Sequence, residues 1–237
     1  MKGFCLEVWG DYACFTRPEM KVERVSYDII TPSAARAIFE SILWKPAIVW
    51  NVKKIEVLNP IKWFSIRRNE VGAIASVGKE CIYTQDSIQQ RATLCLKDVK
   101  YRIYAEFDFI PQEERENHLR NVLYEHTKKK LKEEILNGED ETESKYASMF
   151  ERRASRGQCF NQPYLGCREF SAGFKLINPK EDKVAPIDET KDLGIMLYDM
   201  DFKNLQSPQA LWFFAKMENG IIDVPAWDSK EVLIYKR

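Results

Sequence analysis

Lys145 and Tyr146 are neighbours whose residue types could support metal-free cleavage of RNA. Attack by a 2′-hydroxyl needs a base, an acid for the leaving oxygen, and a cation for the charge that develops on the phosphate. Lysine supplies the cation and can also donate a proton, whereas tyrosine, with a pKa of about 10, is a poor base unless nearby cations lower that pKa. Cations that could do so follow closely: Arg152, Arg153 and Arg156. In the alternative interpretation, Lys145 is a surface charge and Tyr146 a core residue.

Other catalytic and metal-binding signatures are absent from the sequence. It has no phosphate-binding Gly-rich loop, no H-E-x-x-H and no G-x-S-x-G. His118 and His126 lie in one charged segment and are interpreted as solvated helix positions. The cysteines form no C-x-x-C pair, so neither a metal site nor a cofactor is expected. In a reducing cytosol they are expected to be buried thiols: Cys5, Cys14, Cys81, Cys95, Cys159 and Cys167.

Charge is balanced over the whole chain but not along it. The 237 residues include 36 Lys and Arg and 36 Asp and Glu, so the formal net charge is zero. This excludes a simple polybasic arm, but not a basic face balanced by acid elsewhere. Segments 61–102 and 145–168 interleave basic and aromatic residues, a mixture that suits single-stranded RNA because its phosphates need cations and its bases stack on rings. Composition alone favours the plainer interpretation of solvated charges over an aromatic core.

The elements that must position these residues follow from hydrophobic periodicity. Strands are expected at 4–9, at 47–52 continuing to 57, and at 99–109, where apolar and polar residues alternate strictly. Segment 61–97 is expected to be a loop or a hairpin, and 167–174 a late strand.

Two helices are predicted between these strands. Thr31 is a natural cap before a helix that ends ahead of Pro46. A second helix is predicted over 142–154. The charged segment 113–140, which contains Lys128-Lys129-Lys130, is interpreted as a helical insertion.

The order strand, helix, strand, strand, helix, strand is that of ferredoxin-like folds and of RNA-recognition modules. Further on, 210–224 reads as a hairpin around Asn219-Gly220. We therefore expect an α+β protein, with a ferredoxin-like domain over 1–176 and a small antiparallel β domain over 177–237. No apolar run approaches the roughly 20 residues of a membrane helix, and the N-terminus lacks a signal-peptide pattern, so a cytoplasmic protein without a membrane partner is expected.

Four short motifs, in this order and spacing, resemble a known family. They are Gly10-Asp11-Tyr12-Ala13 with Phe15-Thr16, Glu40-Ser41-Ile42-Leu43-Trp44-Lys45-Pro46, Gly166-Cys167-Arg168-Glu169-Phe170, and Met217-Glu218-Asn219-Gly220. Together they resemble the CRISPR-associated RAMP endoribonuclease of subtype I-C systems, the fifth-class Cas protein. The resemblance implies a ferredoxin-like RAMP domain, a small C-terminal β domain, and metal-independent cleavage of precursor crRNA that leaves a 2′,3′-cyclic phosphate.

The resemblance also implies a catalytic set of Tyr, Lys and His. The tyrosine position before Trp-Lys-Pro is Leu43 here, and the Lys-His pair is Lys145-Tyr146. Only the lysine is kept, so Tyr146, or another ring such as Tyr12 or Tyr27, would have to transfer the proton. The lysines at 128–130 are expected to bind repeat RNA.

Two functions follow from these observations. In the first, the chain cleaves CRISPR repeat RNA at its hairpin and stays on the crRNA 5′ handle, beside the other subunits of the type I-C interference complex. In the second, it binds crRNA in that complex without cleaving it. In the first function, Lys145 and Tyr146 are catalytic, and the RNA backbone contacts one lysine and several arginines: Lys45, Arg67, Arg68, Arg152, Arg153, Arg156 and Arg168.

Overall fold

The computed structural model describes residues 3–74, 76–78, 81–111, 114–115, 141–182, 184–202, 204 and 206–234. Most of the expected insertion at 113–140, including Lys128-Lys129-Lys130, lies outside the described residues. No helix among the described residues is long and apolar enough to cross a membrane.

The larger sheet has its long strand β5 at the centre. Its main path runs β6-β1-β5-β3-β9, with every neighbouring pair antiparallel, and β2 and β4 also pair with β5. The strands are β1 (Phe4–Ala13), β2 (Arg24–Val25), β3 (Ile48–Val57), β4 (Lys62–Val71), β5 (Ile88–Phe109), β6 (Gly173–Leu176) and β9 (Ile221–Asp223). The buried face of the alternation from 99 to 109 is confirmed, because Tyr101, Ile103 and Phe107 all point into the core. On the other face Arg102 is an exception, since it is buried between Glu56 and Asp182.

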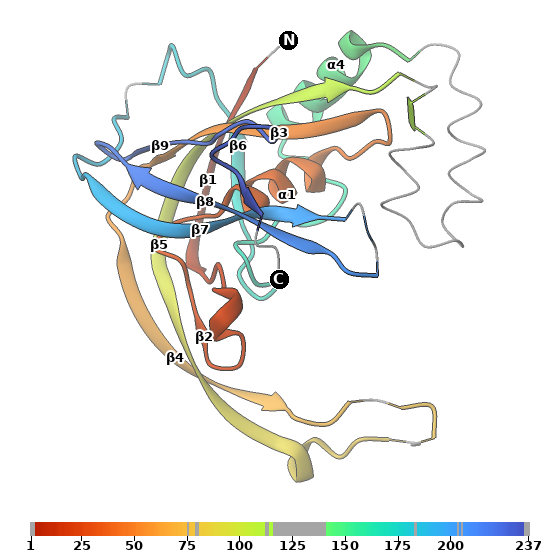
Figure 1. Ribbon diagram of the computed structural model, residues 1–237, viewed down its shortest axis with the longest axis vertical. Coiled ribbons are helices and arrows are strands. Elements are labelled where there is room, and N and C mark those ends of the chain that lie inside the picture. The colour runs from red at the N-terminus through yellow and green to blue at the C-terminus, as the bar shows by residue number, and fades with distance from the viewer. Residues whose placement is uncertain are drawn as a thin grey trace.

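Helix α1 (Pro32–Ile42) begins after the expected cap Thr31, and α4 (Glu143–Ser155) begins one residue after its expected start at Thr142, which is its cap. The hydroxyl oxygens of Thr31 and Thr142 accept hydrogen bonds from the backbone N–H groups of Ala34 and Lys145, at 3.3 and 3.2 Å. Both helices pack on the same face of the large sheet (Figure 1). Phe150 of α4 lies 5.5 Å from Phe39 of α1, ring centre to ring centre. Short 3-10 helices occur at η1 (Pro18–Met20) and η2 (Thr84–Ser87).

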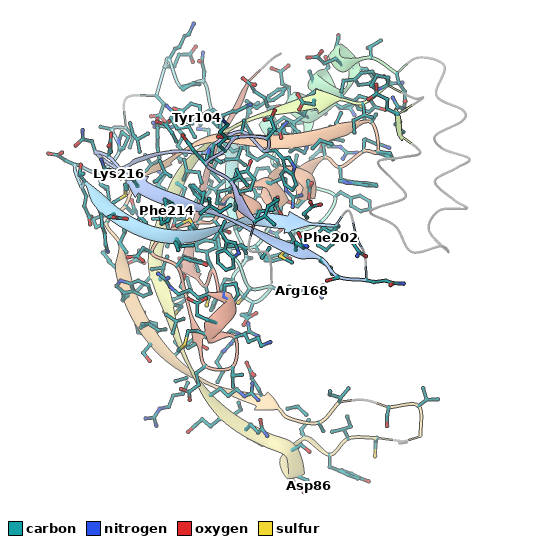
Figure 2. All side chains as sticks on the ribbon, in the orientation of Figure 1. Asp86, Tyr104, Arg168, Phe202, Phe214 and Lys216 are labelled. Carbon is teal, nitrogen blue, oxygen red and sulfur yellow. The ribbon has the colours of Figure 1, made fainter. Side chains whose placement is uncertain are left out.

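The segment expected to be a loop or a hairpin at 61–97 is a hairpin. Strand β4 pairs with the first half of β5 from Lys62–Lys97 to Val71–Ile88, so β5 begins eleven residues before the expected start at 99. We call this hairpin the arm. It extends away from the body of the molecule, and η2 with Asp86 lies near its far end (Figures 1 and 2).

A smaller sheet holds β7 (Lys191–Asp201), β8 (Gln209–Met217) and β10 (Leu233–Ile234), in the order β10-β8-β7. Its inner residues join the same hydrophobic core as the larger sheet. The expected hairpin at 210–224 is confirmed only at its turn, where Glu218 and Ile221 form an antiparallel bridge, and it does not extend into two paired strands. Asn219 and Gly220 do make the turn, both with positive φ, but β9 then pairs with β3 instead of β8. The free edge of β3 offers unpaired backbone groups that β9 satisfies.

Two further strand predictions need correction. The strand expected at 4–9 does not end there but runs as β1 to Ala13, because β5 continues to pair with it. The late strand begins at Gly173 instead of 167, because 165–170 folds into a turn closed by the Leu165 N–H to Phe170 carbonyl bond of 2.7 Å. Cys81 is exposed, contrary to the expectation of buried thiols.

The division into domains at 176 and 177 stays a prediction. The segment after 177 supplies β9 to the larger sheet and all three strands of the smaller one.

Candidate functional site

Lys145 and Tyr146 lie in the first turn of α4 but face different environments. Lys145 is exposed, whereas only 3% of Tyr146 is accessible. The cap at Thr142 fixes the start of the helix and therefore sets which way each side chain points. A phosphate that approached this turn would meet the Lys145 side chain and the positive end of the helix dipole.

The Tyr146 hydroxyl belongs to a polar cluster with Glu141 and Arg115. It donates a hydrogen bond to one carboxylate oxygen of Glu141, and the Arg115 guanidinium contacts the other. Arg115 is itself held by a 2.8 Å bond to the Ile110 carbonyl and lies over the Phe109 ring. The cluster thus holds the Tyr146 hydroxyl in an orientation in which its proton points to Glu141.

The electrostatics of this cluster keep Tyr146 protonated. Burial, followed by the hydrogen bond to Glu141 and its negative charge, raises the pKa of Tyr146 above its ordinary value. Burial opposes ionisation of Glu141, but bonds from Tyr146 and Arg115, with the charge of Lys145, still lower the pKa of this carboxyl. The expectation that nearby arginines lower the pKa of Tyr146 is wrong, because a carboxylate is its closer charged partner.

The end of α1 meets the end of α4 through Arg153. A guanidinium nitrogen of Arg153 donates to the Ile42 carbonyl at 2.9 Å, which satisfies one of the free carbonyls at the helix end. Lys45, three residues later, is half-buried, while Arg152 and Arg156 are exposed on α4 and just after it. Arg153 therefore has a structural partner, and the exposed cations beside it are the ones open to a ligand.

Leu43 is fully buried at the end of α1. Its carbonyl accepts a 2.9 Å hydrogen bond from the Trp50 indole. The position at which the resembling family carries a tyrosine thus contributes a core side chain here. The alternative rings lie elsewhere: Tyr12 packs on Phe64 of the arm, and Tyr27 is buried under Arg17.

The remaining predicted cations lie at the arm and the loop beside it. Arg68 contacts Glu70 at 3.2 Å and also Glu169, so it ties β4 to the loop before β6. Arg67 and Arg168 are exposed. Figure 2 shows Arg168 well apart from α4, so the structure does not gather the predicted residues into one site.

The predicted residues thus form two groups. The α4 group comprises Lys45, Lys145, Tyr146, Arg152, Arg153 and Arg156, and the arm group comprises Arg67, Arg68 and Arg168. Sequence reasoning missed Glu141 and Arg115, the partners of Tyr146. Glu141 stands directly before the cap of α4, which is the one local signal that could have indicated it.

Comparison with known proteins adds a second line of observation. Residues 3–225 match the family model described as CRISPR-associated protein (Cas_Cas5). The chain belongs to the Cas5 family. It is 45% identical over 243 residues to the CRISPR pre-crRNA endoribonuclease Cas5d of Mannheimia succiniciproducens, covering 96% of each chain. It is 36% identical to the protein of the same name from Thermus thermophilus, covering 96% of this chain and 93% of that one.

Solved structures show the same fold at lower identity. The crystal structure of a CRISPR-associated protein matches with a TM-score of 0.67 and 21% identity, covering 99% of this chain and 97% of that one. A functionally uncharacterized protein from Streptococcus mutans matches with a TM-score of 0.65 and 21% identity, over 98% and 97% of the two chains. These similarities support the α+β architecture described above.

Proposed function

We propose that this Cas5 chain is an endoribonuclease that cleaves CRISPR precursor RNA at the repeat hairpin and stays on the crRNA 5′ handle as a subunit of a type I-C interference complex. The observation that carries the proposal is the 45% identity, over 96% of both chains, to a relative named as a pre-crRNA endoribonuclease. The exposed Lys145 in the first turn of α4 supplies a group that fits this chemistry.

We propose a cytoplasmic, ferredoxin-like RAMP protein without a cofactor. The strand order β6-β1-β5-β3, with α1 after β1 and α4 after β5, supports the ferredoxin-like part.

In the proposed mechanism no metal ion takes part. The 2′-hydroxyl gives up its proton to solvent water as its oxygen attacks the adjacent phosphorus. The bond from phosphorus to the 5′-oxygen breaks, that oxygen takes up a proton to become the 5′-hydroxyl, and the other product carries a 2′,3′-cyclic phosphate. Lys145 stabilises the charge on the phosphate and donates the proton that the leaving 5′-oxygen takes up. Tyr146 acts by holding Glu141 and Arg115 in place at the start of α4, since its own proton is directed to Glu141.

The test is incubation of the purified chain with its cognate repeat RNA in EDTA. We expect cleavage at a single position on the hairpin. Absence of cleavage, or cleavage that returns only with a divalent metal ion, contradicts the proposed mechanism.

The exposed arginines at the end of α4 give a prediction about RNA binding. We expect the double substitution Arg152→Ala and Arg156→Ala to weaken repeat-RNA binding and to reduce the slope of log affinity against log salt by about 1.4 to 1.8, since each lost phosphate contact removes about 0.7 to 0.9. Filter binding at salt concentrations from about 50 to about 300 mM measures both the affinity and the salt slope. An unchanged slope would place the RNA elsewhere. Lys175→Ala, on β6, is the matched control.

Tyr146→Phe separates a positioning role from proton transfer. Because the pKa of Tyr146 is raised and its hydroxyl bonds Glu141, we expect cleavage to fall by less than about tenfold, with no change in the shape of the pH profile below pH 9 or so. Single-turnover cleavage rates across this pH range measure it. A loss of about 100-fold or more would instead assign the proton transfer to Tyr146.

The second candidate function is crRNA binding without cleavage. Its support is the buried Leu43 and the Tyr146 hydroxyl directed to Glu141, which leave Lys145 as the retained member of the family set. Under this alternative, Lys145→Ala weakens RNA binding modestly and leaves processing, done by another protein, unchanged.

A further inference from the structure

A groove between α1, β3 and the end of β7 is lined by carboxylates and aromatic rings, whereas an RNA site needs cations. Its volume is about 610 Å³, within the range of ligand-sized grooves. Aromatic side chains from three separate segments form its rim: Trp44 after α1, Phe202 after β7, and Trp227 after β9. These side chains remain 38%, 43% and 41% exposed, so the rim is open to a partner.

The groove is acidic. Among the described residues that line it, one is basic, Arg36, and four are acidic: Glu40, Asp108, Asp199 and Asp201. Arg36 is already neutralised, because it bonds both carboxylate oxygens of Asp199 at 2.7 and 3.0 Å and Glu40 at 2.5 Å. Even without Asp201, the three carboxylates of Glu40, Asp108 and Asp199 outnumber the single guanidinium of Arg36, which gives the described lining of the groove a negative field in a chain whose total charge is zero.

The rim is held by the protein's own contacts. Trp227 packs on Tyr198 with ring centres 5.9 Å apart, and the Tyr198 hydroxyl donates to the Pro225 carbonyl at 3.0 Å. The ion pair of Arg36 with Asp199 fixes α1 against β7. The two walls of the groove are therefore tied to each other.

Carboxylates beside exposed aromatic rings match one chemical class of occupant. The methylene groups of Arg or Lys pack on Trp rings, where the cation also gains a cation–π attraction, and carboxylates bind the charged head. A phosphate backbone would meet repulsion there. We propose that this groove docks a protein segment in which Arg or Lys side chains alternate with apolar ones. It is thus a protein-binding face, distinct from the α4 group, and the inference does not depend on RNA cleavage.

The test titrates the full chain into a dye-labelled twelve-residue peptide of alternating arginine and leucine, with fluorescence anisotropy as the readout. A peptide with glutamate in place of arginine is its control. We expect the basic peptide to bind, the acidic peptide to bind at least about tenfold more weakly, and Trp227→Ala and Glu40→Gln each to weaken the basic peptide about tenfold, which is about 1.4 kcal/mol. Phe202→Ala is the second rim variant if Trp227→Ala does not fold.

The matched control is Phe214→Ala. Phe214 is 69% exposed on β8, well away from Phe202 in Figure 2, and it does not line the groove. Equal peptide binding by the wild type and the rim variants would overturn the proposal. So would a rim variant that loses RNA binding and keeps peptide binding, or light scattering in which the wild type is a dimer and the rim variant a monomer, because the occupant would then be RNA or a second copy.

Discussion

Lys145→Ala is expected to lower the rate of repeat-RNA cleavage by about 10²–10³-fold and to change RNA affinity by no more than about threefold. The reason is that Lys145 is an exposed cation in the first turn of α4, where it would meet charge that develops on the phosphate only in the transition state. Loss of one such group typically costs this much in rate while ground-state binding, carried by several other cations, is retained. Single-turnover cleavage and filter binding measure the two quantities separately.

Two variants make this result specific. Lys145→Arg keeps the charge and is expected to retain more activity than Lys145→Ala. Lys216→Ala removes an exposed lysine of β8 that pairs with Glu218 at 2.6 Å, and it should leave cleavage unchanged. If Lys145→Ala cleaves at the wild-type rate, Lys145 is not the catalytic cation and the proposed active site is wrong.

Gly166→Ala is expected to destabilise the fold by about 3 kcal/mol or more, which corresponds to a fall in Tm of about 6 to 12 °C. Gly166 has a φ of +83°, and a β-carbon there would lie 2.1 Å from the carbonyl oxygen of Cys14 and 2.6 Å from its carbonyl carbon. Both atoms belong to the backbone at the end of β1, so no side-chain rotation relieves the clash. Thermal and urea unfolding measure the loss.

Gly157→Ala is the matched control for this prediction. Gly157 also has a positive φ, +64°, but a β-carbon there meets no atom within 4 Å. We therefore expect only the cost of the left-handed conformation, about 1 kcal/mol, and a fall in Tm of about 2 to 4 °C. Equal losses for the two variants would show that the close approach of Gly166 to Cys14 does not occur.

Local rules predicted most of the elements that carry the α4 group. Thr31 does cap α1, the helix predicted from 142 to 154 is α4 to within one residue at each end, and the alternation of 99–109 does place one face of β5 in the core. Each of these depends on residues close in sequence. The pairing of β9 with β3 was not predictable in this way. The sequence Asn219-Gly220 predicts the same turn whether the strand after it pairs with β8 as a hairpin or joins β3 in the larger sheet.

The environment of Tyr146 shows the same limit at the candidate site. Its neighbours Lys145 and Thr142 could be read from the sequence. Arg115 could not, because it reaches this cluster through a contact with Glu141, which lies 26 positions further along the chain. The nearby arginines in the sequence suggested a lowered pKa for Tyr146, whereas burial, followed by the carboxylate that contacts the hydroxyl, raises this pKa. Titration depends on the nearest charge in space, and that depends on the tertiary fold.

The measurement that tests the central proposal most directly is cleavage, in EDTA, of two repeat RNAs that differ by one oxygen atom. One carries the natural 2′-hydroxyl next to the scissile phosphate, and the other carries 2′-deoxyribose there. We expect the natural RNA to yield a 2′,3′-cyclic phosphate end and the deoxy RNA to bind without being cleaved. Cleavage of the deoxy RNA, or a product with a 3′-hydroxyl formed only when metal ions are present, would contradict cleavage by the neighbouring 2′-oxygen.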